Sequence, residues 1–327
     1  MIRRLDRLAA ALVLGLTAVT VWAQYRGVGH VVPGADSVGY LQYFELGAHR
    51  STLHGTGVNP WEYRILSEWV AELFLQAAHG LGFEHWPVVG FVSFRVLQNL
   101  VIFALFWVLL RRFGFDRRVA ALGMGLLAWA MTQALHDSGL AFNTYTDLAV
   151  YLVAAILILD GRYRWIVALM VVGALNRETS GLIPVMLFAV AVMHGLRTPQ
   201  GRRALWCAIA ALAVYAVITI SLRLIIGPAP LFKPFGLSPG GAYAEHNLRS
   251  GLTWEYLART LTIVPFLGLA AIRRWPRELK AFGLAIVPAW LLIHLFASIL
   301  AESRLLLVPY AVVLVPGALF LFRPRHG

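Results

Sequence analysis

Charged side chains gather where apolar stretches of this sequence end, and their types suit the binding of a phosphorylated substrate. Arginine recognises phosphate through paired N–H donors, and carboxylates can act as general bases or hold a metal ion. Tyrosine and tryptophan near these charges offer flat faces to a sugar or a lipid. The candidate residues are Asp36, Tyr40, Glu62, Tyr63, Arg64, Asp147, Arg177, Glu178, Glu302 and Arg304, with His246 and Arg249 on a separate segment.

Several of these charges are expected to lie deep in a membrane. Arg177 and Glu178 follow an apolar run that begins at Trp165, which places them about 18 Å into a hydrocarbon core that is about 30 Å thick. The same reasoning places Arg95 about 22 Å and Arg304 about 27 Å from the first boundary. A charge at such a depth costs at least a few kcal/mol unless it is paired or faces water. Two interpretations stay open, namely mutual neutralisation in buried ion pairs, or a polar cavity that opens outward.

The composition supports a membrane setting for these residues. The chain has 327 residues, of which 59% are hydrophobic and 13% charged, and its mean hydropathy is +0.71. This composition excludes a disordered chain and a soluble globular enzyme. Cys207 is the one cysteine, so no disulfide framework or cysteine metal cluster is expected. No polar segment is long enough for a soluble domain, and residues 1–327 are predicted to form a single integral-membrane domain.

The apolar runs predict an all-α fold, a transmembrane bundle of about ten spans. A spanning helix needs roughly 20 mostly apolar residues, and three of the runs reach that length only with a polar turn at one end. The ten runs cover residues 8–25, 96–110, 119–135, 148–159, 165–176, 179–196, 204–222, 260–272, 281–301 and 305–322.

The first of these runs has two interpretations. Arg3, Arg4 and Arg7 form a basic start, and residues 21–23 weakly resemble a signal-peptidase site. An uncleaved first helix is favoured, because the apolar run is long for a signal sequence and Trp22 is unfavourable beside a cleavage site.

The distribution of charge predicts the orientation of the bundle. Ten alternating spans place both termini and four short basic turns on one side, which then holds 18 of the 28 lysines and arginines and a net charge of +14. The positive-inside rule assigns this side, with both termini, to the cytoplasm. The net charge of +12 is thereby explained by membrane anchoring, and no nucleic-acid partner is expected. The expected location is the bacterial plasma (inner) membrane, as part of the cell envelope.

The opposite side carries two long outer loops, at about residues 25–90 and 227–258. Long loops with a pattern of their own are usually functional. In the first loop, apolar residues recur at helical spacing before and after a turn rich in glycine and threonine. This pattern predicts two interfacial helices that lie on or in the outer membrane surface.

Four features resemble the GT-C superfamily of integral-membrane glycosyltransferases, which includes protein O-mannosyltransferases and the aminoarabinose transferase of lipid A. The first helix leads into a long outer loop with an early acid and a following tyrosine, here Asp36 and Tyr40. A Pro-aromatic-acid-aromatic-basic stretch follows at residues 60–64. A short span ends in Asn-Arg-Glu-Thr at residues 176–179 and returns with Pro184. A late outer turn reads Glu-Ser-Arg at residues 302–304. The resemblance extends over nearly the whole chain, although each motif is short.

The resemblance implies transfer of a sugar from a polyprenyl-phosphate donor to the hydroxyl of a lipid, glycan or protein acceptor at the outer face. It implies Asp36 as the general base and inversion at the anomeric carbon. The residues that match donor-binding positions in kind are Arg64, Arg177, Glu178, Arg304, His246 and Arg249, with Tyr40, Glu62, Tyr63, Asp147 and Glu302 in support. Ser37 follows Asp36 where many members have a second acid, so no metal or other cofactor is expected to be required.

Three other interpretations remain open. A transporter or lipid flippase would also have buried charges and about ten helices, but the sequence shows no inverted repeat. A polysaccharide polymerase or ligase would carry its long outer loop late in the chain, whereas the most acid-rich loop here is the first. A non-catalytic partner in envelope assembly would look almost the same as an active enzyme.

Overall fold

The fold is described from a computed structural model, which covers residues 7–28, 36–134 and 140–323. Within these residues the chain is helical, and the extended pairing is limited to one isolated bridge between Asn59 and Leu231. Backbone groups in a bilayer must find their hydrogen-bond partners within the protein, which explains the helical architecture. The basic residues expected at Arg3, Arg4 and Arg325 lie outside the described residues.

Eight helices of 13 residues or more form the body of the bundle. They are α1 (Arg7–Gly27), α5 (Trp86–Arg112), α6 (Arg117–Gln133), α7 (Phe142–Leu159), α8 (Tyr163–Asn176), α9 (Leu182–His194), α10 (Pro199–Ile226) and α14 (Arg277–Ala297). The last apolar segment is a succession of short helical pieces, namely η6 (Ser303–Leu306), α15 (Leu307–Pro309), η7 (Tyr310–Leu314), α16 (Val315–Leu319) and η8 (Phe320–Phe322).

Helices of 3 to 16 residues form the connections. The first long connection contains α2 (Ser37–Gly39), η1 (Tyr40–Glu45), α3 (Leu46–Leu53), η2 (Trp61–Tyr63) and α4 (Ile65–Gly80), and η3 (Glu178–Gly181) joins α8 to α9. The second long connection contains η4 (Pro234–Gly236), α11 (Gly241–Arg249) and α12 (Gly251–Leu261), followed by α13 (Val264–Ala270) and η5 (Ile272–Arg274). Both predicted outer loops are therefore largely helical.

The chain is an integral membrane protein, because six helical segments in its described part are long and apolar enough to cross a bilayer. They are Arg7–Gly27, Trp86–Arg112, Phe142–Leu159, Pro199–Ile226, Arg277–Ala297 and Ser303–Phe322, with shorter apolar helices at Tyr163–Asn176 and Glu178–His194. The expectation of about ten spans is not confirmed.

The apolar run at 260–272 is interrupted, so the prediction of one continuous helix there is wrong. α12 ends at Leu261, and Thr262 then adopts a φ of 52°, a left-handed conformation that a regular helix excludes. Pro265 lies in the first turn of α13, where its missing N–H leaves no intrahelical bond unmade. Hydropathy alone could not reveal this break, because every residue around it is compatible with a membrane.

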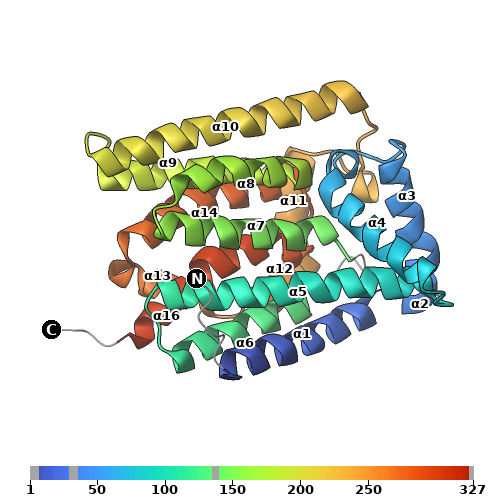
Figure 1. Cartoon of the computed structure of the whole chain (residues 1–327), viewed down its shortest axis with the longest axis horizontal. Helices are drawn as coiled ribbons and strands as arrows, with labels where there is room; N and C mark the ends of the chain where they lie inside the picture. Colours follow the sequence, from blue (N-terminus) through green and yellow to red (C-terminus); the bar gives the residue numbers. More distant parts are fainter. Residues whose placement is uncertain (1–6, 29–35, 135–139, 324–327) are drawn as a thin grey trace.

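The body helices run alongside one another, and their connections sort to opposite ends of the bundle (Figure 1). The turns at 112–117, 159–163, 194–199 and 270–277 all lie at the left end in that view. α2, α3 and α4 lie at the right end, where α3 and α4 cross the ends of the longer helices (Figure 1). The basic turns and the first long connection are thus separated by the length of the bundle.

Two segments of equal apolarity occupy opposite positions in this bundle. In an apolar 18-residue stretch of the segment 303–322, the mean hydropathy is 2.4 and 83% of the residues are buried within the protein. In the corresponding stretch of α10, the mean hydropathy is 2.3 and 6% of the residues are buried. α10 packs against α8 and α9 and leaves the rest of its surface exposed, as at the upper edge of Figure 1. The last segment is therefore the centre of the core, and α10 is a peripheral helix.

α1 is attached to the bundle by buried polar contacts as well as by apolar packing. Asn99 of α5 donates to Thr20 Oγ1 at 2.9 Å and to Gln24 Oε1 at 3.1 Å. Gln24 in turn donates to the hydroxyl of Tyr145 on α7 at 2.9 Å. These bonds satisfy amide groups that would be costly in an apolar interior, and they set the register of α1 against α5 and α7.

Candidate active site

A cavity of about 470 Å³ lies at the end of the bundle that carries α2–α4. Its wall is assembled from η1, α3, the segment that leads into η2, α4, the start of α7, the chain that follows α10 and the turn after α14. The lining residues are Tyr40, Glu45, Ala48, His49, Ser51, Thr52, Thr56, Gly57, Val58, Trp61, Glu68, Ala141, Phe142, Asn143, Phe232 and Arg304. It therefore brings together two carboxylates, an imidazole, a guanidinium and several aromatic faces from seven parts of the chain.

One wall of the cavity is built by a contact between α3 and α4. His49 of α3 is buried, with Nδ1 2.6 Å from Oε2 of Glu68 and Nε2 2.8 Å from Oε2 of Glu72. Burial by itself would lower the pKa of His49, but the hydrogen bonds to the two carboxylates outweigh it and the pKa is raised. An imidazolium between two carboxylates fixes the side chain of Glu68 at the cavity wall.

Glu45 is a carboxyl whose proton affinity suits acid–base chemistry. Burial, together with the negative charge of Glu68, raises the pKa of Glu45 to about 7. The positive charges of Arg304 and Arg95 act in the opposite direction. A carboxyl with a pKa near 7 is an efficient proton acceptor or donor at neutral pH.

Arg304 supplies the positive charge of the cavity. Its Nη2 donates to Oε2 of Glu302 at 2.8 Å, and the side chain of Arg304 is 8% exposed. The short η6 turn that follows α14 positions both residues, and Ser303 between them contacts Thr260 Oγ1 at 2.6 Å. A guanidinium held at a cavity wall provides directed N–H donors for a phosphate or another anion.

The predicted acid and tyrosine of the first-loop motif are divided between the surface and the cavity. Asp36 is exposed and accepts a hydrogen bond from Gly39 N at 2.7 Å, so it is the N-cap of α2. Tyr40, one turn later, lines the cavity and stacks on Phe44 with ring centroids 5.6 Å apart. The cavity lining thus includes the tyrosine of the predicted pair and does not include Asp36.

The predicted stretch at residues 60–64 forms one edge of the cavity. Trp61 lines it and meets Phe232 edge-to-face at 4.9 Å. The side chain of Glu62 is buried behind this edge. The hydroxyl of Tyr63 donates to Gly227 O at 2.8 Å, which ties this segment to the chain that follows α10. Trp61 therefore offers an aromatic face to a ligand, while Tyr63 supports the segment from behind.

Four other predicted residues form a second cluster, built on η3. Arg64 reaches Glu178 Oε2 through Nε and Nη2, each at 3.0 Å. Asp147 accepts hydrogen bonds from the hydroxyls of Thr179 and Ser180, both at 2.7 Å. The remaining member, Arg177, is buried. For Arg64 and Glu178, mutual neutralisation in an ion pair is the arrangement observed.

This η3 cluster adjoins the cavity through the start of α7. Arg177 Nη1 donates to Thr144 Oγ1 at 2.9 Å, and Thr144 donates to Asn143 Oδ1 at 3.3 Å. Asn143 lines the cavity and its carbonyl accepts a hydrogen bond from Asn176 Nδ2 at 2.8 Å. The η3 cluster therefore supports the cavity wall without being part of the lining.

His246 and Arg249 lie elsewhere. They line a separate surface depression on α11, and Arg249 pairs with Glu245 at 2.6 Å on an exposed face. Neither residue is part of the cavity lining. The sequence placed them with the site only because they share the outer side of the chain.

The acids of the cavity were not among the candidates taken from the sequence. Glu45 and His49 are spaced four residues apart, as are Glu68 and Glu72, and each pair falls on one face of a helix. Two such pairs on neighbouring helices are the sequence pattern that could have predicted this group of acids and histidine. Within the described part of the chain, no three His, Cys, Asp or Glu side chains are arranged to hold a metal ion.

Comparison with other proteins does not assign a family. No family model matches the sequence, and neither a curated protein nor a solved structure is significantly similar to it.

Proposed function

We propose that the protein is a membrane glycosyltransferase, which moves a sugar from a polyprenyl-phosphate donor to an acceptor hydroxyl at the extracytoplasmic face. The observation that carries the proposal is the cavity shared by Glu45 and Arg304. It combines a carboxyl with a pKa of about 7 and a fixed guanidinium at one end of a membrane bundle. Transfer from a lipid phosphate needs a base for the acceptor and a positive charge for the leaving group.

The arrangement of basic turns supports the proposed orientation. Four turns at the end opposite the cavity, together with the residues that flank them, carry 13 of the 25 lysines and arginines in the described chain, and positive loops favour the cytoplasm. The cavity end then faces the exterior, where nucleotide sugars are absent and lipid-linked sugars are the available donors. The location that follows is a plasma membrane, with the bacterial inner membrane as the proposed setting.

The proposed reaction is a single displacement. Glu45 takes the proton of the acceptor hydroxyl as the oxygen attacks the anomeric carbon. The bond between that carbon and the phosphate oxygen breaks, and the polyprenyl phosphate leaves with the electron pair. Arg304 stabilises the charge on the departing phosphate. Attack from the face opposite the leaving group inverts the anomeric centre, and the proton on Glu45 is later released to water.

Aromatic residues of the cavity suit the sugar in this proposal. Trp61 and Tyr40 supply flat apolar faces, and Asn143 and Thr56 supply polar groups in the same lining. A binding site with largely apolar walls and a few directed polar groups is typical for small organic ligands. The η3 cluster holds Asn143 from behind, so Arg64, Arg177, Glu178 and Asp147 are proposed to be positioning residues.

The base can be identified by comparing two carboxylates. The resemblance to GT-C enzymes implies Asp36, whereas the cavity favours Glu45. Purified protein in liposomes would be supplied with labelled polyprenyl-phosphate sugars and envelope lipid acceptors. Glu45→Gln is expected to lower transfer about 10²- to 10⁴-fold, the usual contribution of a general base. Asp36→Asn is expected to change it less than about threefold, because the side chain caps a short surface helix.

Glu84→Gln is the matched control, because Glu84 is an exposed carboxylate in the same outer segment. Each variant is accepted only if it elutes as a single species and melts near the wild-type temperature. Loss of transfer in Asp36→Asn with retention in Glu45→Gln would assign the base to Asp36. A wild-type protein that carries lipid-linked sugars across the bilayer without transferring them would contradict the transferase proposal and favour a flippase.

A further inference from the structure

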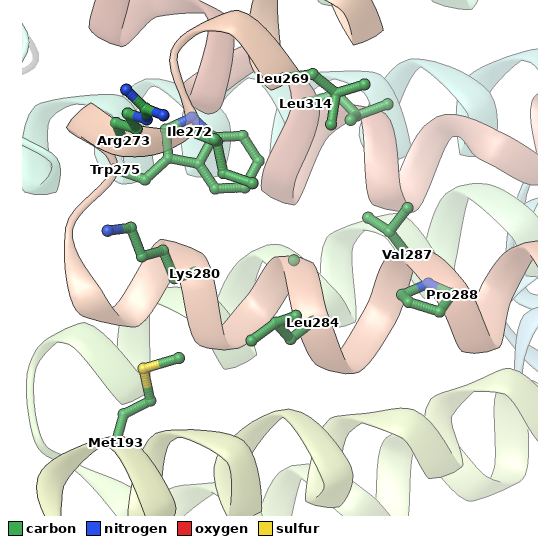
Figure 2. Close-up of a pocket in the computed structure, with 11 residues that line it drawn as sticks. Met193, Leu269, Ile272, Arg273, Trp275, Lys280, Leu284, Val287, Pro288 and Leu314 are labelled. Atoms are coloured by element: carbon green, nitrogen blue, oxygen red, sulfur yellow. The ribbon is translucent and has the colours of Figure 1, made fainter.

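A second cavity lies on the side of the bundle, far from the candidate active site. It is a groove of about 430 Å³ between α13, α14 and the last apolar segment (Figure 2). Leu269, Leu284, Val287, Pro288 and Leu314 form its apolar walls. Leu269 and Leu284 are each more than 60% exposed, so the groove opens to the surface, and Leu284 belongs to α14, which is long and apolar enough to cross a membrane. In a bilayer this opening faces lipid.

The indole of Trp275 forms the floor at one end of the groove. Its Nε1 donates to Gly317 O at 3.1 Å. Two glycines permit this position: a Cβ on Gly317 would overlap the indole, and one on Gly283 would lie 3.0 Å from it. Because Trp275 packs closely against these helices, its rigid indole ring defines the shape of the groove at this end.

Two basic side chains stand at the same end of the groove as Trp275. Arg273 and Lys280 lie on either side of the indole, while Val287 and Pro288 lie at the other end (Figure 2). Within the described part of the chain neither cation forms an ion pair. The nearby acid, Glu278, has its carboxylate 4.0 Å from His194 Nε2. The groove is therefore apolar along its length and positively charged at one end.

We propose that this groove binds an anionic phospholipid of the surrounding bilayer. The phosphate of the headgroup contacts Arg273 and Lys280, and an acyl chain follows the apolar walls past Leu284 toward Leu314. Charge complementarity selects this occupant, because the two cations lie at the end of the bundle that carries the other basic turns. Basic residues at the edge of a membrane attract anionic lipids, and an apolar groove adjoining them adds contact along the chain. The proposal does not depend on the transferase function.

The test is native mass spectrometry of the full-length protein in detergent, with phosphatidylglycerol or phosphatidylcholine added at equal concentrations. Wild-type protein is expected to retain phosphatidylglycerol more tightly. The double variant R273Q/K280Q is expected to bind phosphatidylglycerol about 30-fold more weakly, since each basic residue near an anionic lipid contributes about fivefold. Its affinity for phosphatidylcholine should change little.

R202Q/R203Q is the matched control, because it removes two exposed arginines from the same end of the bundle but outside the groove. An equal loss of phosphatidylglycerol in this control would overturn the proposal, since it would show non-specific attraction. Equal retention of both lipids by the wild-type protein would overturn it without any variant. Weaker retention of undecaprenyl phosphate in R273Q/K280Q, with retention of phosphatidylglycerol unchanged, would overturn the assignment of the groove to a phospholipid.

Discussion

His49 Nδ1 lies 2.6 Å from Oε2 of Glu68, and this contact joins the two helices that cross the end of the bundle. The same imidazole contacts Glu72, so α3 is held to α4 at two points one helical turn apart. Glu68 also lines the candidate active site, where its charge helps to raise the pKa of Glu45. The contact between α3 and α4 therefore also positions a charge that affects the pKa of the proposed base, Glu45.

We first predict that His49 makes stability dependent on pH. Its pKa is raised in the folded protein, so its contribution is fully present below the unfolded pKa of 6.5 and is lost as pH rises through the folded pKa. His49→Gln should lower stability by about 2 kcal/mol at pH 6, where it removes hydrogen bonds to charged groups. The difference in melting temperature between wild type and variant, measured in nanodiscs, should shrink as the pH rises above 6.5. A difference that stays constant with pH would show that titration of the imidazole does not contribute to stability in this range.

A second prediction concerns the pH dependence of transfer. If Glu45 is the base, the rate at limiting substrate should rise about tenfold per pH unit below pH 7 and level off above it, because the carboxylate is the active form. Glu68→Gln removes a negative charge that raises the pKa of Glu45, so the midpoint should move to lower pH. The measurement is a pH–rate profile in liposomes for both proteins. A midpoint that moves upward would mean that Glu68 does not act on the titrating group in this way.

Third, we predict a measurable coupling between Arg64 and Glu178. Their side chains are 13% and 28% exposed, so the pair is partly shielded from solvent. A double-mutant cycle with Arg64→Gln and Glu178→Gln should give a coupling energy of about 1 to 3 kcal/mol. The exposed pair of Arg259 and Glu255, at 2.5 Å, is the control and should give about 0.5 kcal/mol or less. Equal couplings in thermal or chemical unfolding would contradict the assignment of a structural role to the first pair.

Fourth, Gly90 should be intolerant of substitution. A Cβ on Gly90 would lie 2.8 to 3.0 Å from the side chain and backbone of Leu75, so α5 and α4 can approach closely only at a glycine. Gly90→Val should cost about 1 to 3 kcal/mol through overpacking. Gly80→Ala is the control, because no atom lies within 4 Å of its added Cβ, and it should be neutral or stabilising. Unfolding of both variants in detergent provides the comparison, and a neutral Gly90→Val would disprove the close-packing argument.

The sequence determined the class of the protein and the positions of most helices. Apolar runs predicted the segments that became α1, α5, α6, α7, α8, α9, α10 and α14, because the cost of exposing polar groups to lipid acts on each segment separately. It also predicted two helices in the first outer loop and the sorting of basic turns. In the structure, the basic turns between the body helices lie together at one end of the bundle (Figure 1).

The sequence determined less about the candidate site. Of the residues selected from the sequence, Arg304 and Tyr40 line the cavity, and Arg64 and Glu178 meet as a pair. The sequence did not select Glu45, His49 or Glu68. Acids and histidines on amphipathic helices usually face solvent, and only the crossing of α3 over α4 turns these inward.

Only the tertiary structure decided which apolar segment is central and which carboxylate is enclosed. The segment 303–322 and α10 have nearly equal hydropathy, yet one is the core and the other is peripheral. Lipid and protein interior are almost equally apolar, so composition carries little information about which of them a helix contacts. Likewise Asp36 and Glu45 are both acids of the first loop, and their difference in exposure depends on packing between distant segments. The sequence thus determined that each of these helices lies in apolar surroundings, and long-range contacts decided whether those surroundings are lipid or protein.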